Sequence, residues 1–221
     1  NYKQTDRPAI TESKNMELYK AVHSAQHCQR NFDLSKKMPT EDIKTLVTAA
    51  TQCPSKQNIA FYKLHVITNR DVIDEIYESC SGTGFDGDSQ PTNPQVLANL
   101  VFVFEEYKNY DNSGPNSNPE TKRADEDWAK AALNNDRNQA VGVAAGMVNL
   151  SAAQLGYGTG CCACILDMPR LKKAIGAKNG VLLVMGIGYR DTTRSRREHH
   201  LHENVLFKTR KKQAVPMNYL K

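Results

Sequence analysis

A short polar segment, with Ser55, Gln57 and Asn58, follows directly on a predicted helix that Pro54 ends. Hydroxyl and amide groups can hydrogen-bond the edge of a heteroaromatic ring, because they offer both donors and acceptors. The same residue types also form turns that satisfy their own backbone groups. The segment is therefore a candidate ligand-binding loop, and the alternative is an ordinary turn before the next strand.

Arginines occur at two places that suit an anionic group. Arg194, Arg196 and Arg197 lie just after the last predicted core strand. Clustered guanidinium groups bind a phosphate dianion through forked, charge-assisted hydrogen bonds; the alternative is a solvated connection. Arg30 precedes Phe32 and places a cation where the chain enters the core. A lone arginine is usually a surface charge, but the polar segment and the later arginines favour a binding role for Arg30.

A glycine-rich segment, Gly-Tyr-Gly-Thr-Gly, spans residues 156–160. Glycine has no Cβ and accepts positive φ, so the backbone there can approach a flat ligand closely. A helix that ends at Gly156, followed by a plain turn, explains the sequence equally well. A dinucleotide-binding fold is not favoured, because its fingerprint needs a preceding strand, whereas a predicted helix precedes this segment.

Cysteine and histidine clusters do not predict a metal site. Cys161, Cys162 and Cys164 are too crowded to close a tetrahedral site, and we interpret them as small buried residues beside a ligand. All six cysteines are predicted to be reduced thiols. His199, His200 and His202 form the only histidine cluster, which we expect to be exposed.

The elements that would position these residues are readable from periodicity. Residues 40–50 predict a helix with Thr40 as its N-cap, and apolar residues recur at helical spacing within it. Strands are predicted at 61–68, 100–105 and 181–188, and two further short helices are predicted at about 71–79 and 168–175.

A long helix is predicted from Asp125, and its part from Gln139 to Leu155 is small and apolar almost all round. Such a helix is expected to be buried on all sides, at the centre of the domain or at a dimer interface. Segments 81–94 and 108–122 are rich in small polar residues and predict loops. Surface excursions are favoured, and the alternative is that loops of this length cover a site.

The 221 residues, of which 39% are hydrophobic, predict one domain over 1–221. The apolar run 140–155 is too short to span a bilayer, and we expect a cytoplasmic protein without a membrane anchor. The formal net charge is +5, and Lys208, Arg210, Lys211 and Lys212 cluster near the C-terminus. A solvated tail is favoured over a nucleic-acid patch, because no binding motif accompanies these residues. Hydrolase and nucleoside-triphosphatase motifs are absent from the sequence.

Taken in order, these features resemble the nitroreductase family of flavoenzymes over roughly residues 16–207. The most specific parts are Pro54-Ser55-x-x-Asn58 and the Leu-Gly-Tyr-Gly-Thr-Gly run from Leu155 to Gly160. The resemblance implies an α+β fold with a mixed central sheet flanked by helices. It also implies a homodimer that exchanges its C-terminal segment, here 189–221, with one FMN at each of two interface sites and helix 140–155 at the interface.

The resemblance assigns roles to the polar and glycine-rich segments. Asn58 would contact the flavin ring edge, and Ser55 and Gln57 would lie along the pyrimidine and ribityl side. The backbone of Gly160, Cys161 and Cys162 would donate hydrogen bonds toward flavin N5 and O4.

The resemblance also assigns the segment 26–30, with one departure. Arg30 would lie near the flavin pyrimidine as an electrostatic stabiliser, and Cys28 stands where a serine is common. Gln26 stands where many members have a phosphate-binding arginine, so His27, or one of the arginines 194, 196 and 197, would supply the missing charge.

The activity implied is hydride transfer from NAD(P)H through the flavin to an electron-poor acceptor, such as a nitroaromatic, a quinone or an activated alkene, with ping-pong kinetics. The flavin N5 carries the chemistry, and no catalytic acid is expected in the protein. The alternatives are a specialised flavin enzyme of the same fold, namely a dehydrogenase, a dehalogenase or a flavin-fragmenting oxygenase, and a non-catalytic protein associated with nucleic acid. The sequence does not choose between NADH and NADPH or name the acceptor.

Overall fold

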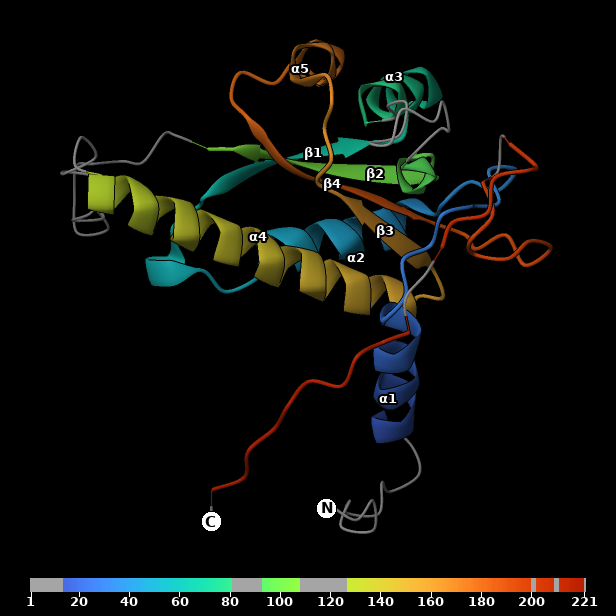
Figure 1. Cartoon of the computed structure of the whole chain (residues 1–221), viewed down its shortest axis with the longest axis horizontal. Helices are drawn as coiled ribbons and strands as arrows, with labels where there is room; N and C mark the ends of the chain where they lie inside the picture. Colours follow the sequence, from blue (N-terminus) through green and yellow to red (C-terminus); the bar gives the residue numbers. More distant parts are fainter. Residues whose placement is uncertain (1–13, 81–92, 108–126, 200–201, 209–210, 221) are drawn as a thin grey trace.

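A four-stranded sheet between two helical layers forms the centre of the molecule (Figure 1). The computed structural model describes residues 14–80, 93–107, 127–199, 202–208 and 211–220. The strands follow the order β1-β2-β4-β3, and α2 and α4 cover one face while α3 and α5 cover the other. The strands are β1 Tyr62–Ile67, β2 Leu100–Glu106, β3 Gly158–Cys162 and β4 Val181–Gly188. The helices are α1 Lys14–Ala25, α2 Thr40–Thr51, α3 Arg70–Cys80, α4 Asp127–Gln154 and α5 Met168–Ile175, with the 3-10 turns η2 Lys56–Asn58 and η3 Pro94–Val96.

The predicted strands and short helices are confirmed, but the expectation of a mixed sheet is wrong for the described chain. All three strand pairings are antiparallel. The end of β1 pairs with the start of β2, at Ile67 and Val101. β1 and β2 are therefore antiparallel neighbours, and they are not parallel strands joined by a crossover.

Alternation along β2 divides the core between the two faces of the sheet. Leu100, Phe102 and Phe104 pack with α2 and α4, whereas Val101 and Val103 pack with α3 and α5. All five side chains are fully buried. Because both faces of the sheet are covered along Leu100 to Phe104, these five positions form an unbroken hydrophobic run.

Helix α2 has the predicted extent but not the predicted cap. Pro39 occupies the N-cap position with extended backbone, and no side chain caps the helix there. Thr40 is the first helical residue and is exposed. Proline has no side-chain acceptor, so no side chain at the N-cap position satisfies the first amides of α2.

Helix α4 is predicted to be buried on all sides, either at the centre of the domain or at a dimer interface, and the single chain contradicts the first of these positions. Its face toward the sheet is buried, with Val141, Ala144 and Val148 in the core. The opposite face carries Val143 and Met147, which are 42% and 38% exposed. The part of α4 from Ala140 to Val148 is apolar throughout and has no polar stripe, so the sequence does not indicate which of its faces meets solvent.

Segment 93–99 crosses the sheet at the glycine positions of β3 and β4. A Cβ added to Gly186 would lie 2.0 Å from the carbonyl oxygen of Gln95, and one added to Gly188 would lie 2.0 Å from Oδ1 of Asn99. At Gly160 the added Cβ would lie 2.5 Å from Cβ of Gln95. Only glycine permits this contact, so these positions hold segment 93–99 directly against the strands.

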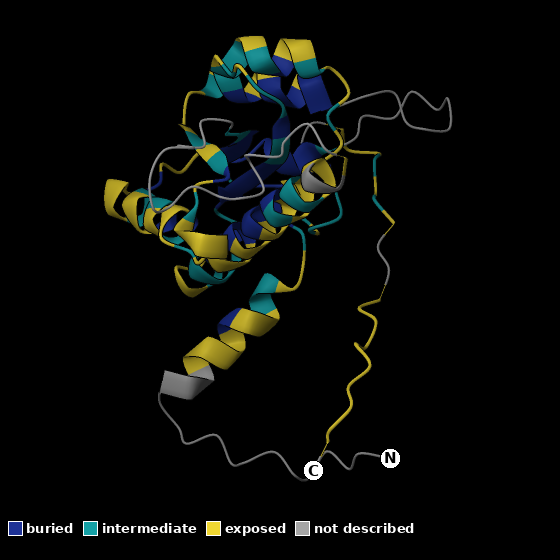
Figure 2. Ribbon diagram, turned by 90° about the vertical axis from the view of Figure 1, so that its left-hand side faces the viewer, coloured by how far each residue is buried: buried dark blue, intermediate teal, exposed yellow. Residues whose placement is uncertain are grey.

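The two predicted loops, 81–94 and 108–122, lie outside the described residues, except that Asn93 and Pro94 begin η3. The start of the long helix near Asp125 also lies outside them. Of the described helices, α4 included, none is both long and apolar enough to cross a membrane. Helix α1 and segment 211–220 are largely exposed (Figure 2).

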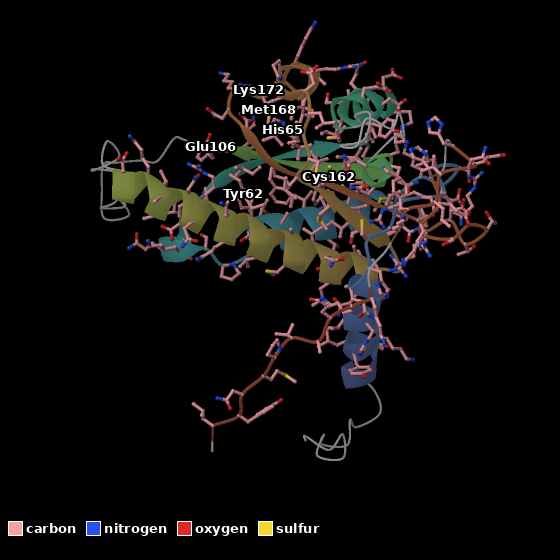
Figure 3. The ribbon with its side chains drawn as sticks, viewed as in Figure 1. Tyr62, His65, Glu106, Cys162, Met168 and Lys172 are labelled. Carbon is pink, nitrogen blue, oxygen red and sulfur yellow. The ribbon has the colours of Figure 1, made fainter. Side chains whose placement is uncertain are left out.

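A buried carboxylate ties β2 to the segment before β4. Glu105 is 2% exposed, and its Oε1 accepts hydrogen bonds of 2.8 Å from the backbone amides of Lys178 and Asn179. Its Oε2 lies 2.7 Å from Nε2 of His65 on β1, which Figure 3 labels. Burial opposes ionisation of Glu105, but the amide and His65 contacts outweigh it and lower the pKa from 4.5 to about 2.

We expect Glu105→Gln to lower the free energy of unfolding by about 2 kcal/mol at pH 7, because charge-assisted bonds to two amides are lost. The folded-state pKa lies below the unfolded value, so the ionised carboxylate stabilises the fold above pH 4.5 and this contribution is lost as the pH falls toward about 2. Urea unfolding across this range should show the difference from wild type shrinking. Glu41→Gln is the control, because Glu41 forms an ion pair with Lys44 and its side chain is 80% exposed. Its free energy of unfolding should stay within about 0.5 kcal/mol of wild type.

Candidate functional site

Segment 29–33 runs beside the outer edge of β3, so it meets the glycine-rich segment. The amide of Gln29 donates to the carbonyl of Thr159 at 2.8 Å. Further along, Phe32 forms a β-bridge with Arg190. Arg190 is the second residue after β4, which ends at Gly188. Residues 26–30 and 158–162, which are far apart in the sequence, therefore lie together, as the predicted site requires.

A buried asparagine brings the late arginines to the same place. The side-chain amide of Asn31 donates to the carbonyls of Ser195 and Glu198, at 2.5 and 3.0 Å. This connection holds segment 195–198 against segment 29–33, and Nη1 of Arg196 donates to the carbonyl of Cys28 at 3.4 Å. Arg196 is thus the predicted phosphate candidate that lies beside residues 26–30.

The other two predicted arginines have other partners. Nε of Arg194 lies 3.6 Å from Oδ2 of Asp191 in a local ion pair. Nε of Arg197 donates to the carbonyl of Phe207 at 2.8 Å and fixes a turn of the C-terminal segment. Arg194 and Arg197 therefore each have a polar partner within this chain, outside residues 26–30.

The region around His27 is electropositive. His27 is exposed, and desolvation together with the nearby Arg196, Arg190 and Lys212 lowers its pKa. Gln26, which precedes it, is also exposed and carries no charge. Cations of the C-terminal segment therefore gather at the position where the sequence lacks an arginine.

The guanidinium of Arg30 is anchored on one side and unsatisfied on another. Its carbon lies 5.4 Å from the centre of the Phe207 ring, in a cation–π contact. Its Nη1 is buried, and no hydrogen-bond partner lies within reach among the described residues. A buried donor without a partner costs about 1 to 3 kcal/mol, so an acceptor supplied by a ligand would be favourable here.

The thiols of Cys28 and Cys161 are held in the neutral form. Burial raises the pKa of Cys28, against the lowering effect of Arg30 and Arg196. Desolvation, with Cys28 and Cys162 nearby, raises the pKa of Cys161 to about 11. At neutral pH these two side chains are uncharged. The prediction of buried cysteines is confirmed for Cys162 but wrong for Cys161 and Cys164, which are exposed at the end of β3 and just after it.

The polar loop after α2 forms the 3-10 turn η2, with Gln57 and Asn58 at φ 55° and 58°. The hydroxyl of Ser55 donates to the carbonyl of Ile59 at 2.8 Å, so this part of the loop does satisfy its own backbone. Asn58 is exposed and lines a pocket of about 560 Å³ together with Ser55, whereas Gln57 is not in the lining.

The pocket beside η2 is closed on one side by a thiol and a phenol. Sγ of Cys53 lies 3.2 Å from the hydroxyl of Tyr62, which also donates to the carbonyl of Ala50. Burial and the Cys53 contact raise the pKa of Tyr62. The phenol therefore stays protonated and fixes the wall of the pocket.

Within one chain the two halves of the predicted site are apart. The η2 loop precedes β1 and the glycine-rich segment forms β3, the opposite edge strands of the sheet, about 14 Å apart at the usual strand spacing. Figure 3 labels Tyr62 and Cys162 on these two strands. Lys56 of η2 pairs with Asp136 of α4, whereas the Asn149 side chain of α4 donates to Ala25, next to Gln26. These two positions are about 20 Å apart along the helix.

The glycine-rich segment combines a helix end and a strand. Gly156 has φ 89° after α4, which confirms the helix end, and β3 follows. The order helix, turn, strand agrees with the rejection of a dinucleotide-binding fold. The space next to Gly158 and Gly160 is filled by side chain or backbone of Arg190, Gln29 and Gln95, so protein atoms make the close approach expected of a ligand.

The prediction that the histidine cluster is exposed is wrong for His199. It is fully buried, and its Nε2 lies 3.0 Å from the hydroxyl of Tyr77 on α3. The Phe207 ring stacks on it. His202 is exposed and His200 lies outside the described residues. No group of three metal-ligating side chains occurs in the part of the chain that the structure describes, Cys162 and Cys164 included.

Arg190 and Phe207 were missed in the sequence. The guanidinium of Arg190 is partly buried, which lowers its pKa, and it donates to the hydroxyl of Ser24 at 2.6 Å and to the carbonyl of Tyr157 at 3.1 Å. The position of Arg190 directly after the Gly-Ile-Gly-Tyr strand end was a usable signal. Phe207, within a polar tail, gave none.

Comparison with known proteins gives a family and a fold. The model of the nitroreductase family matches residues 24–189. A protein of Exiguobacterium sibiricum solved in complex with FMN is 18% identical, with a TM-score of 0.58 over 83% of this chain and 91% of that one. A nitroreductase-like protein of Streptococcus mutans is 18% identical, with a TM-score of 0.59 over 82% of this chain and 93% of that one. The NADPH:FMN oxidoreductase of Vibrio harveyi, solved with NAD+, is 15% identical, with a TM-score of 0.59 over 88% of this chain and 80% of that one. None of the curated proteins matches this chain.

Proposed function

Because this chain belongs to the nitroreductase family, we propose that it is an FMN-dependent oxidoreductase that passes reducing equivalents from NAD(P)H to an electron-poor small molecule. The observation that carries the proposal is the buried, unsatisfied Nη1 of Arg30. It lies in a cationic region beside the backbone of β3, where the family resemblance puts the flavin.

The residues present fit FMN. Arg196, Arg190 and Lys212 surround His27 and supply the charge for a phosphate that Gln26 does not. Arg30 offers a donor to a carbonyl or ring nitrogen of the pyrimidine. The side chain of Asn58 and the pocket at η2 suit the polar edge of the ring. Arg194 and Arg197 are not assigned to phosphate, because each has a partner in its own segment.

We assign the two halves of the site to two chains of a homodimer. Arg30 and Asn58 belong to opposite edges of the sheet of one chain. The exposed face of α4, with Val143 and Met147, lies between them and would be buried by a second copy. In such a dimer Arg30 of one chain and Asn58 of the other face a shared site.

The C-terminal segment supports exchange between the two chains. Val215, Met217, Tyr219 and Leu220 are between 61% and 91% exposed. Apolar side chains in an extended tail gain stability only when another surface covers them. The proposed cover is the partner chain, in keeping with the wrapping segment predicted over 189–221.

The chemistry supplied by bound FMN is hydride acceptance from NAD(P)H and its onward transfer to a nitroaromatic, quinone or activated alkene. The protein would position the flavin and polarise its ring. Arg30 places a fixed positive charge where negative charge would gather, which favours the reduced state. The neutral thiols of Cys28 and Cys161 add no competing negative charge, and no protein acid is required.

The proposal is tested by the visible absorption spectrum of protein reconstituted with FMN and freed of unbound flavin, before and after anaerobic addition of NADH or NADPH. We expect flavin bands that bleach with at least one nucleotide and return when a quinone is added. Flavin that remains oxidised with both nucleotides, so that its bands do not bleach, would indicate a specialised flavin enzyme of the same fold. Failure to retain FMN would reject the proposal.

Arg30→Gln is expected to weaken FMN binding roughly tenfold, about 1.4 kcal/mol, because one charge-assisted hydrogen bond is lost. It should also lower the midpoint potential of the bound flavin. Flavin fluorescence titration and a potentiometric titration measure the two effects. Arg194→Gln removes the same charge from the Asp191 pair and should change neither value; equal effects in both variants would remove Arg30 from the site.

Val143→Arg is expected to convert a dimer into a monomer, because it puts a charge on the exposed face of α4. Sedimentation should show wild type at twice the chain mass of 24.7 kDa and the variant at that mass. The variant should keep its circular dichroism spectrum and lose FMN. Leu166→Arg, at a residue 53% exposed before α5, should remain dimeric. A wild-type monomer that retains FMN would contradict the shared site.

A further inference from the structure

A second pocket, of about 490 Å³, lies between loop 34–38 and the first turns of α2 and α3. None of the residues assigned above to FMN lines it. Its volume lies in the range typical of small-molecule sites. It is lined by Leu34, Ser35, Lys36, Lys37, Met38, Thr40, Ile43, Thr68, Arg70, Ile73, Ala98 and Asn99.

The charged residues in the lining are all cations, Lys36, Lys37 and Arg70. Carboxylates reach two of them from outside the pocket. Asp33 lies 3.0 Å from Nζ of Lys36, and Asp74 lies 3.4 Å from Nε of Arg70. Lys37 has no ion pair with any described residue. The pocket therefore presents an excess of positive charge.

Arg70 is held rigidly in the pocket wall. Its Nη2 donates to the carbonyl of Ala98 at 3.1 Å. Its Nε is buried and, apart from the ion pair with Asp74, makes no hydrogen bond among the described residues. Burial lowers the pKa of this guanidinium. A partly desolvated cation of this kind gains from a nearby anion.

Two helices begin at the pocket. Thr40 is the first residue of α2 and Arg70 the first of α3, and both are in the lining. The positive ends of both helix dipoles therefore add to the charge of the side chains. The first-turn acids Glu41, Asp42 and Asp71 are not in the lining, and Asp42 instead accepts a hydrogen bond from Tyr157.

The pocket wall is fixed before any ligand arrives. The side-chain amide of Asn99 donates to the carbonyls of Asp33 and Lys36, both at 2.9 Å, and so fixes the loop that carries the lysines. The lining also has an apolar part, in which Leu34 is 41% exposed and Ile43 is half-buried, above the buried Met38 and Ile73.

From this arrangement we propose that the pocket binds a small organic anion, a carboxylate or phosphate attached to an apolar body. The anionic group meets Lys37, Arg70 and the two helix starts, and the apolar body lies over Leu34 and Ile43. The site is separate from the FMN site and does not depend on the proposed function.

The test is a titration of ¹⁵N-labelled protein, supplied with saturating FMN so that the flavin site is blocked, with three probes. Octanoate carries both features, octylammonium has the same body with a positive charge, and inorganic phosphate is an anion without the body. Octanoate should shift the amide signals of Lys37, Thr40 and Arg70, and bind at least about tenfold more tightly than either other probe. Octylammonium binding as tightly would overturn the assignment of an anion, and phosphate binding as tightly would overturn the apolar body.

Two variants locate the binding. Lys37→Gln and Arg70→Gln should each weaken octanoate binding at least about fivefold. Lys44→Gln is the matched control, because this lysine pairs with Glu41 on α2 outside the pocket and should leave the affinity unchanged. Wild-type affinity in both pocket variants would overturn the site. If the protein does not retain FMN, the same titration without flavin gives the same comparisons, so failure of the proposed function and failure of this site are distinguished.

Discussion

The close contact between segment 93–99 and the strands is the constraint on which both sites depend. Gly186 and Gly188 leave no room for a side chain, because Gln95 and Asn99 occupy the space that a Cβ would need. The side-chain amide of Gln95 also donates to the carbonyl of Cys161, at 3.3 Å. Asn99, through its bonds to Asp33 and Lys36, sets the loop that lines the anion pocket. One short segment therefore fixes the backbone at the proposed flavin site and the wall of the second pocket.

Side chains that connect distant segments complete this arrangement. Asn31 connects the chain near residue 30 to the segment near 196, and Tyr77 connects α3 to His199. The cations of the proposed flavin site come from the two ends of the chain, so their juxtaposition depends on these buried polar contacts. Buried amides and imidazoles are costly unless satisfied, and each contact therefore specifies one register of the C-terminal segment.

Three of the four described strands and the short helices α2, α3 and α5 follow from the sequence, because alternation and turn residues report local burial directly. Strand β3 was interpreted as a turn because of its glycines, and helix α1 was not predicted. The polar loop at Asn58 and the meeting of residues 26–30 with 158–162 were likewise expected. What could not be predicted depends on contacts between distant residues. The burial of His199 depends on Tyr77, the choice of Arg196 depends on Asn31, and α4 has no polar stripe to show its exposed face. The cationic pocket escaped notice because Lys37 and Arg70 are separated by a helix and a strand and share no motif.

The position of β4 in the sheet has a consequence for biosynthesis. β4 lies between β2 and β3, and among the described strands it is the last to be made. While the ribosome is still translating residues before 181, β1 and β2 can pair, but β3 has no strand beside it. The sheet closes only when β4 emerges and inserts between the two parts, so folding is completed late in translation. Until then the inner edge of β2 is an unpaired apolar strand, which makes the nascent chain a natural client for a chaperone.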